Sequence, residues 1–252
     1  MDNQEFDLYD NFIDDCLYGD TIDYAAIFEE AVLAQNFLFW GKLNEGSGVT
    51  MLDSTTPAYN GSYSGVAWDG TLSPLGELAL EFDGLLSIGT LTNATFLTLA
   101  NLDEGTMICF IKARNAGVWS DGATRRFMYF ERNSTNRVIL GKTTVVNQVS
   151  AARVAGGANQ TTNYTLPSAT TDWLAAAVTW SVSGNALKLF VGNALRDTQS
   201  GLLAAGVAPV RLTIGANNGP LNVHDGYECN VLFGNTALAD ATVIDIMQKG
   251  NP

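Results

Sequence analysis

Short strand-like runs recur about every ten residues from Asn36 onward, separated by glycine, asparagine, aspartate and proline. Residues 106–111 are continuously apolar, as in a buried strand, whereas residues 77–82 alternate apolar and polar side chains. Further strands are predicted at residues 126–131, 137–140, 173–182, 186–191, 210–214 and 227–233. Many short strands at this spacing predict an all-β protein, built as a sandwich or a barrel.

The composition agrees with a β-protein that has many turns. Charged residues make up only 15% of the 252 residues, and 25 residues are glycine. Hairpin turns are predicted at residues 183–185 and 192–193, and a short helix at residues 240–248, capped by Asp240. The three cysteines, Cys16, Cys109 and Cys229, are far apart and odd in number, which argues against a disulfide framework and against a zinc site.

The charge of the chain is concentrated at its N-terminus. The formal net charge is −13, and residues 1–35 contain ten acids without any lysine or arginine. The remainder has 16 acids against 13 bases, so we expect a nearly neutral body with an acidic arm. Nucleic-acid binding needs clustered lysine and arginine, so we expect no nucleic-acid partner. We also expect no secretory signal and no membrane insertion.

The arm combines its acids with aromatic side chains, which disordered acidic tails usually lack. Residues 20–35 predict a helix capped by Asp20 or Thr21, with one apolar stripe. The stripe either docks on another protein subunit or lies across the chain's own β-body. We favour docking, because the arm has much charge and little core. The docking residues would be Phe6, Tyr9, Phe12, Tyr24, Phe28 and Val32.

An aromatic strand at residues 37–40 is followed by turn segments at residues 44–48 and 52–54. These segments resemble the opening strand and turns of laminin-G-like, concanavalin A-like lectin domains. The later segments keep the family order, at residues 60–62, 68–70, 80–84, 172–180, 187–193, 212–215 and 226–238. The resemblance implies a two-sheet antiparallel jelly-roll sandwich over residues 36–252, preceded by the mainly helical arm 1–35 and ended by the short helix.

The sequence departs from the family at several turn positions. Glu228, Cys229 and Asn230 stand where the family has Ile-Asp-Glu, and Gly192-Asn193 replaces an Asp-Gly turn. Ala239 and Thr242 replace the family's cap serine and helix glutamate. These are mostly structural turn positions, so the departures leave the expected fold unchanged. They weaken the case for any metal or sugar site that the resemblance would imply.

Most tryptophans are predicted to fill the space between the two sheets, namely Trp40, Trp68, Trp173 and Trp180. Trp119 lies in a glycine-containing segment with polar neighbours. Trp119 and Asp121 are therefore the candidate ligand-binding residues, although a tryptophan that plugs its loop would fit the same pattern.

The case for catalysis or a metal is weak. The single histidine, His224, could pair with Cys229, but a loop histidine and a buried thiol explain both more simply. Glu81 and Asp83 lack the third acid of the "E-x-D-x-E" strand found in laminarinase-type enzymes of this fold. Calcium could use turn aspartates such as Asp53, Asp69 and Asp83, but it is not favoured, and we expect no cofactor.

Arm and sandwich together suggest a non-enzymatic virion protein of a virus or bacteriophage. In this interpretation the arm docks on other virion proteins or on copies of the same chain, and the sandwich is displayed towards a host-surface glycan. The alternatives are a lectin-like carbohydrate-binding module of a cell and, less favoured, a glycoside hydrolase. Localisation in the virion follows from the first interpretation alone.

Overall fold

The computed structural model describes residues 22–205 and 207–252 and shows two antiparallel sheets packed face to face. This confirms the predicted all-β sandwich. Sheet A has seven strands, in the order β1 (Phe39–Gly41), β15 (Asp225–Gly234), β6 (Glu104–Ala113), β11 (Leu174–Ser181), β12 (Ala186–Val191) and β13 (Leu195–Gln199), with β4 (Leu80–Asp83) also paired to β15.

Sheet B has eight strands. Their order is β10 (Ala158–Thr165), β9 (Gln148–Ala155), β8 (Asn136–Lys142), β7 (Arg125–Asn133), β14 (Arg211–Ile214), β5 (Ile88–Leu91), β3 (Gly61–Ser64) and β2 (Thr50–Met51). The helical segments are α2 (Tyr24–Leu33), α3 (Ala94–Leu99), the 3-10 turn η1 (Ala116–Trp119) and α4 (Asp240–Gly250). No helix of the described part of the chain is long and apolar enough to cross a membrane.

The main core lies between the sheets and is centred on aromatic rings. Phe233 of β15 contacts Phe130 of β7 at a centroid distance of 4.6 Å and Phe96 of α3 at 5.3 Å. Trp180 lies 6.2 Å from Phe233 and packs over Gly105, where any Cβ would collide with the indole. The predicted core positions of Trp40 and Trp180 are confirmed, whereas Trp68 and Trp173 are only half-buried.

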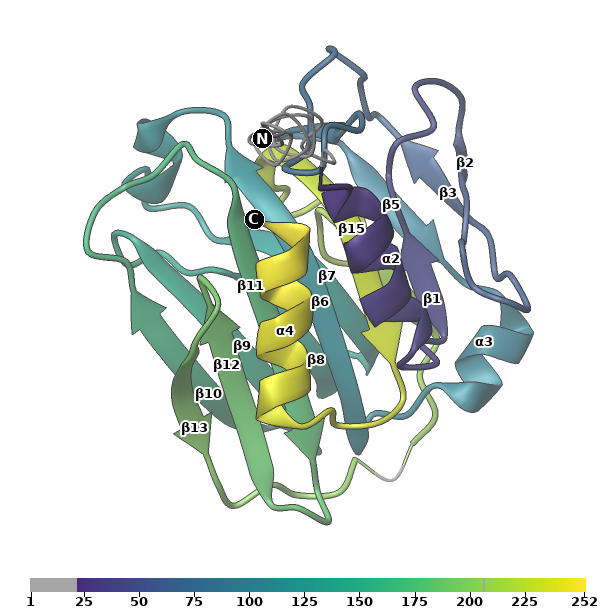
Figure 1. Cartoon of the computed structure of the whole chain (residues 1–252). Helices are drawn as coiled ribbons and strands as arrows, with labels where there is room; N and C mark the ends of the chain where they lie inside the picture. The colour runs from purple at the N-terminus through teal and green to yellow at the C-terminus, as the bar shows by residue number, and fades with distance from the viewer. Residues whose placement is uncertain (1–21, 206) are drawn as a thin grey trace, which may run out of the picture.

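A second core lies on the outer face of sheet A, under helices α2 and α4. The two helices lie side by side across this face (Figure 1). Phe28 of α2 makes edge contacts with Trp40 at 6.0 Å and with Phe110 at 5.6 Å. Gly250 ends α4 directly above Phe110, and a Cβ there would clash with that ring. Val243, Ile246 and Met247 of α4 complete this cluster.

The helical part of the predicted arm therefore packs on its own protein. Phe28 and Val32 are each 1% exposed, so the prediction that these two residues dock on another subunit is wrong. The helix also begins later than expected, because Asp23 accepts the backbone N–H of Ala26 at 3.0 Å and caps it. Tyr24 is 45% exposed and its docking role stays a prediction. Phe6, Tyr9 and Phe12 lie outside the described residues.

The C-terminal helix is confirmed, with a different start from the one expected. Asp240 does not cap it; the capping position is Ala239, which makes no side-chain hydrogen bond to the helix. The Asp240 carboxylate instead accepts a hydrogen bond from Lys188 Nζ at 2.7 Å. A long-range ion pair with a neighbouring strand has replaced the expected local cap.

Replacing Phe28 by alanine tests this packing. We expect Phe28→Ala to lower the free energy of unfolding by about 3 kcal/mol, because it opens a cavity between α2 and sheet A. Tyr24→Ala, one turn earlier on the exposed side, should change it by less than about 0.5 kcal/mol. Urea denaturation of both full-length variants is the measurement. Equal, small effects would show that α2 does not pack on the sheet in solution.

Candidate functional site

Helices α2 and α4 cover part of sheet A, so three other surfaces are open to a ligand. They are the loops at the end of the sandwich that holds Asp121, a groove beside the start of α4, and the outer face of sheet B, over which the described residues place no helix. The sequence pointed to the first of these surfaces.

The candidate residue Trp119 is buried, and its predicted role as an exposed ligand platform is wrong. Its side chain is 2% exposed and belongs to the core between the sheets. The indole Nε1 donates to the carbonyl oxygen of Thr170 at 2.7 Å. Asn115 starts the 3-10 turn by accepting the N–H of Gly117, and this turn directs Val118 and Trp119 inward. The alternative of a loop-plugging tryptophan is the one observed.

Asp121 remains at the surface, where it balances buried cations. Its carboxylate accepts hydrogen bonds from Arg125 Nη2 at 2.6 Å, Lys142 Nζ at 3.1 Å and the backbone N–H of Ala123 at 2.9 Å. Partial burial would raise the pKa of Asp121, but these hydrogen bonds outweigh it and lower the pKa. Lys142 is almost fully buried and also donates to two carbonyl oxygens. Asp121 therefore stabilises the loop end, and its oxygens are already engaged.

A groove of about 410 Å³ runs between the loops next to this cluster. Arg125 lines it, with Nη1 bound to the carbonyl oxygens of Gly84 and Val223. Leu85 and Leu221 line its sides, and both are highly exposed. The groove thus offers mostly backbone and aliphatic surface, with its one cation already held by protein oxygens.

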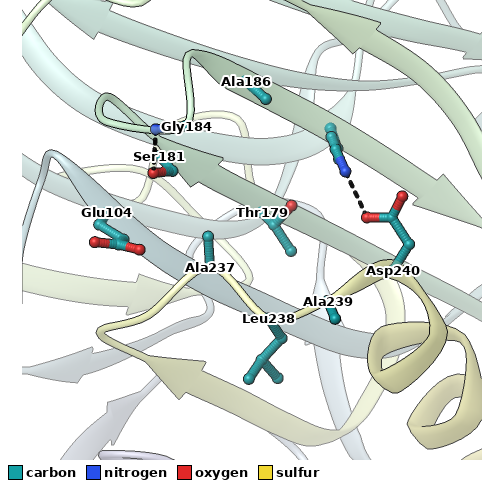
Figure 2. Close-up of a pocket in the computed structure, with 10 residues that line it drawn as sticks. Glu104, Thr179, Ser181, Gly184, Ala186, Ala237, Leu238, Ala239 and Asp240 are labelled. Atoms are coloured by element: carbon teal, nitrogen blue, oxygen red, sulfur yellow. Dashed lines mark hydrogen bonds and ion pairs between the residues drawn. The ribbon is translucent and has the colours of Figure 1, made fainter.

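A second groove, of about 490 Å³, lies on the outer face of sheet A beside the start of α4. Figure 2 shows Glu104 and Asp240 on opposite sides of it, with Thr179 and Ala237 between them. Two carboxylates across a groove are the outline of a glycoside hydrolase site. Here Asp240 is paired with Lys188 at 2.7 Å, and both acids are partly exposed, whereas a catalytic acid needs burial to keep its proton near neutral pH.

The turn aspartates considered for calcium are used by the backbone. Asp53 accepts the N–H groups of Trp40, Thr55 and Tyr59. Asp83 accepts three N–H groups from residues 85–87; burial would raise its pKa, but these hydrogen bonds lower it to about 2. Residues 22–205 and 207–252 contain no group of three or more histidine, cysteine, aspartate or glutamate side chains placed to hold a metal.

The other sequence candidates for chemistry are enclosed in the protein. His224 is 1% exposed between the rings of Phe82 and Phe127, and burial lowers its pKa to about 4. Cys229 is fully buried in the cluster under the helices. Glu81 accepts a hydrogen bond from Arg114 Nη1 at 2.6 Å. The simpler interpretation, a buried thiol and a structural histidine, agrees with this placement.

Glu228 is a buried acid that the sequence marked only as a departure from the family. It pairs in register with Ile111 and Leu80, whose side chains belong to the core between the sheets. Its side chain is 0% exposed, and neither carboxyl oxygen has a hydrogen-bond partner among the described residues. Burial raises the pKa of Glu228 well above its usual value and so favours the neutral form of the carboxyl group.

Comparisons with known proteins show similarity at the level of structure. No family model matches the chain, and no curated protein matches it. A structure of botulinum neurotoxin type C, whose cell entry depends on interaction with two ganglioside molecules, matches with a TM-score of 0.65 at 13% identity, over 90% of this chain and 53% of that chain. The receptor-binding domain of the type G neurotoxin matches with a TM-score of 0.63 at 9% identity, over 85% of this chain and 51% of that one.

The receptor-binding domain of the C/D mosaic neurotoxin matches with a TM-score of 0.64 at 8% identity, over 84% of this chain and 51% of that chain. The chain thus spans about half the length of each of these structures. At such low identities the likeness concerns the fold, and it confirms the lectin-like β-sandwich.

The buried carboxyl group makes the stability depend on pH. Unfolded Glu228 loses its proton above about pH 4.5, whereas the folded protein retains it, so folding takes up a proton and stability falls as pH rises. We expect the free energy of unfolding of Glu228→Gln to rise relative to that of the wild type by up to about 1.4 kcal/mol per pH unit above pH 5, until the pH reaches the pKa of Glu228 in the folded protein. Urea denaturation from pH 5 to 8 measures this.

The control for this series is Glu30→Gln, which changes an exposed acid without an ion pair among the described residues. Its free energy of unfolding should follow the wild type at every pH. A constant difference between Glu228→Gln and the wild type across the range would mean that Glu228 is ionised in the folded protein.

Proposed function

We propose that this chain is a non-enzymatic recognition module whose β-sandwich binds carbohydrate at a surface. The observation that carries the proposal is the likeness, over 84–90% of the chain, to receptor-binding domains, with one matching structure reported to interact with gangliosides. The described helices α2 and α4 lie on sheet A and leave the outer face of sheet B without a helical cover. The described acids and the histidine are largely engaged in turns, ion pairs or burial, which supports a binding rather than a catalytic role.

We further propose that the module belongs to a virion and is attached by its N-terminal segment. Two features support attachment. Residues 1–35 hold ten acids and no base, a one-sided charge that suits a docking surface of the opposite sign. Exposed apolar side chains also lie on α2 or just before it: Ile22, Tyr24, Ile27 and Leu33. Partners would be other virion proteins or copies of the same chain.

A carbohydrate-binding module of a cell is the second candidate function. The observation that favours it is the packing of Phe28 and Val32 on sheet A, since the helix then completes the sandwich by itself. In that case the segment before α2 would be dispensable for assembly.

Screening the labelled full-length protein on an array of neutral and acidic glycans tests carbohydrate recognition. We expect saturable binding to a subset of glycans and no shortening of the bound oligosaccharides after prolonged incubation. An array without signal would contradict the proposal. Released sugar would contradict the non-enzymatic part, and loss of that release in Glu104→Gln or Asp240→Asn would assign it to the groove of Figure 2.

The mass of the protein in solution tests the attachment proposal. The full-length chain should self-associate or bind its partner, and a chain lacking residues 2–21 should remain folded and monomeric, because it keeps α2 and both cores. Tyr24→Ser in the full-length chain tests the exposed side of the helix separately, and we expect weaker association. Identical masses for all three proteins under all conditions would favour the cellular module.

A further inference from the structure

The outer face of sheet B carries three arginines close to one tyrosine. On β7, Met128 and Phe130 point into the core, so alternation directs Tyr129 and Glu131 outward. In the same way, Arg137 of β8 and Arg211 of β14 face outward, since Val138 and Leu212 point inward. Arg126 stands before a β-bulge of β7, where Phe127 and Met128 both point inward, and its interaction with Arg137 and Tyr129 places it on the same outer face.

The strand register brings three of these charges into one row. Glu131 is the direct partner of Arg137 on one side and of Arg211 on the other. Its carboxylate lies 3.0 Å from Arg211 Nε, and Arg211 Nη1 also donates to Asn218 Oδ1 at 2.5 Å. One arginine of the face is therefore neutralised by Glu131.

The other two arginines have no such partner. Within the described part of the chain, no carboxylate lies within ion-pair distance of Arg126 or Arg137. Both side chains are half-buried, and the Nε of each is enclosed without a hydrogen-bond partner. A guanidinium has five N–H donors in a planar fork that fits a carboxylate or sulfate. Two guanidinium groups without an ion pair among the described residues thus lie close together on one face of a protein whose net charge is −13.

The surroundings make this pair costly without an anion. Burial and, to a smaller extent, the nearby charge of Arg137 together lower the pKa of Arg126 to about 10. Two cations on a half-buried surface repel each other, and an anion bound at their Nη groups would relieve that repulsion. Tyr129 is only 4% exposed and lies two residues before Glu131 on β7, and burial together with the charge of Glu131 raises the pKa of its hydroxyl group.

A row of polar side chains crosses the sheet beside the arginines and ends at Ile139 of β8, the register partner of Tyr129. Ser62, Thr90, Thr213 and Tyr129 are successive register partners on β3, β5, β14 and β7. Adjacent strands are about 4.8 Å apart, so this row spans about 14 Å. Thr213 is buried and bonded to backbone oxygens, whereas Ser62 is exposed and Thr90 is half-buried. Hydroxyl groups beside an anion site suit a ligand that carries both an acid and alcohols.

We propose that Arg126 and Arg137 bind the acidic group of a saccharide, a carboxylate or a sulfate, on the outer face of sheet B, with the neutral sugar lying along the polar row. This inference rests on the proposed carbohydrate recognition and names its ligand class and its place. Polyanionic nucleic acid is disfavoured, because two arginines make few phosphate contacts and the acidic chain repels it.

Isothermal titration of the full-length protein with three matched probes tests the inference. The probes are lactose, 3′-sialyllactose and 3′-sulfated lactose, which share one neutral core and differ in the acid. We expect at least one acidic probe to bind about tenfold or more tightly than lactose, because charge-assisted hydrogen bonds to the anion are added. A preference between the two acidic probes identifies the group as carboxylate or sulfate.

Variants locate the site. Arg126→Gln and Arg137→Gln should each weaken acidic-probe binding about tenfold while lactose binding stays unchanged. Arg126→Lys should restore only part of the affinity, since lysine keeps the charge and loses the planar fork. Arg132→Gln is the matched control, because Arg132 is exposed on the same strand and has no ion pair among the described residues. Thermal melting without ligand shows whether each variant is folded. The increase in Tm on adding 3′-sialyllactose should be smaller for Arg126→Gln and Arg137→Gln than for the wild type.

Several outcomes would overturn the inference. Equal affinity for lactose and both acidic probes would do so while leaving carbohydrate recognition intact, and so would acidic-probe binding that Arg126→Gln and Arg137→Gln do not weaken. If no probe binds but the glycan array is positive for neutral glycans, the arginine site alone fails. If the array is also blank, carbohydrate recognition fails with it.

Discussion

The edge contacts of Phe28 with Trp40 and Phe110 determine which surfaces of the sandwich remain available. The outer face of sheet A carries apolar side chains, and an apolar sheet face must be buried against another layer. Helices α2 and α4 provide that layer from opposite ends of the sequence (Figure 1). The outer face of sheet B carries arginines, threonines and a serine beside buried side chains such as Tyr129 and Ile139, so it offers polar groups to a ligand without a covering helix among the described residues.

The charged groups of the body are of two kinds, those with a partner in the protein and those without one. Asp121, Asp83 and Glu81 are bound by cations or backbone N–H groups and hold loops and strand ends in place. Arg126 and Arg137 are held by no carboxylate of the described residues, although they lie on paired strands of sheet B. Rigid strands position side chains more precisely than loops do, which is an advantage for recognition. Because the charges at the loop end already have partners and these two arginines do not, we place the proposed recognition site on sheet B.

Sequence patterns predicted the fold well where large apolar residues alternate or cluster. The strand at residues 186–191 agrees with β12, and residues 106–111 lie within β6. The hairpin of β9 and β10 was not predicted, because its strands consist mainly of alanine, serine, threonine and asparagine. Gly156 and Gly157, both at positive φ, form its turn and were the one local signal available.

The site could be predicted much less well, because it depends on register and on burial. Polar neighbours made Trp119 look exposed, yet one 3-10 turn carries it into the core. Phe28 and Val32 of the predicted apolar stripe are buried and Tyr24 is not, and the spacing of the stripe could not tell a foreign surface from the protein's own sheet. Arg126, Arg137 and Arg211 are far apart in sequence, and only the pairing of β8, β7 and β14 brings them together. No spacing rule would have found them.

The most direct test of the account is to follow the arginine Nε–Hε signals of the full-length protein by NMR during titration with 3′-sialyllactose and 3′-sulfated lactose. We predict that the chemical shifts of Arg126 and Arg137 change with one of these ligands, while those of Arg114 and Arg132 stay constant. Movement confined to Arg125, which lines the loop-end groove, or no movement of any arginine signal with either ligand, would contradict it.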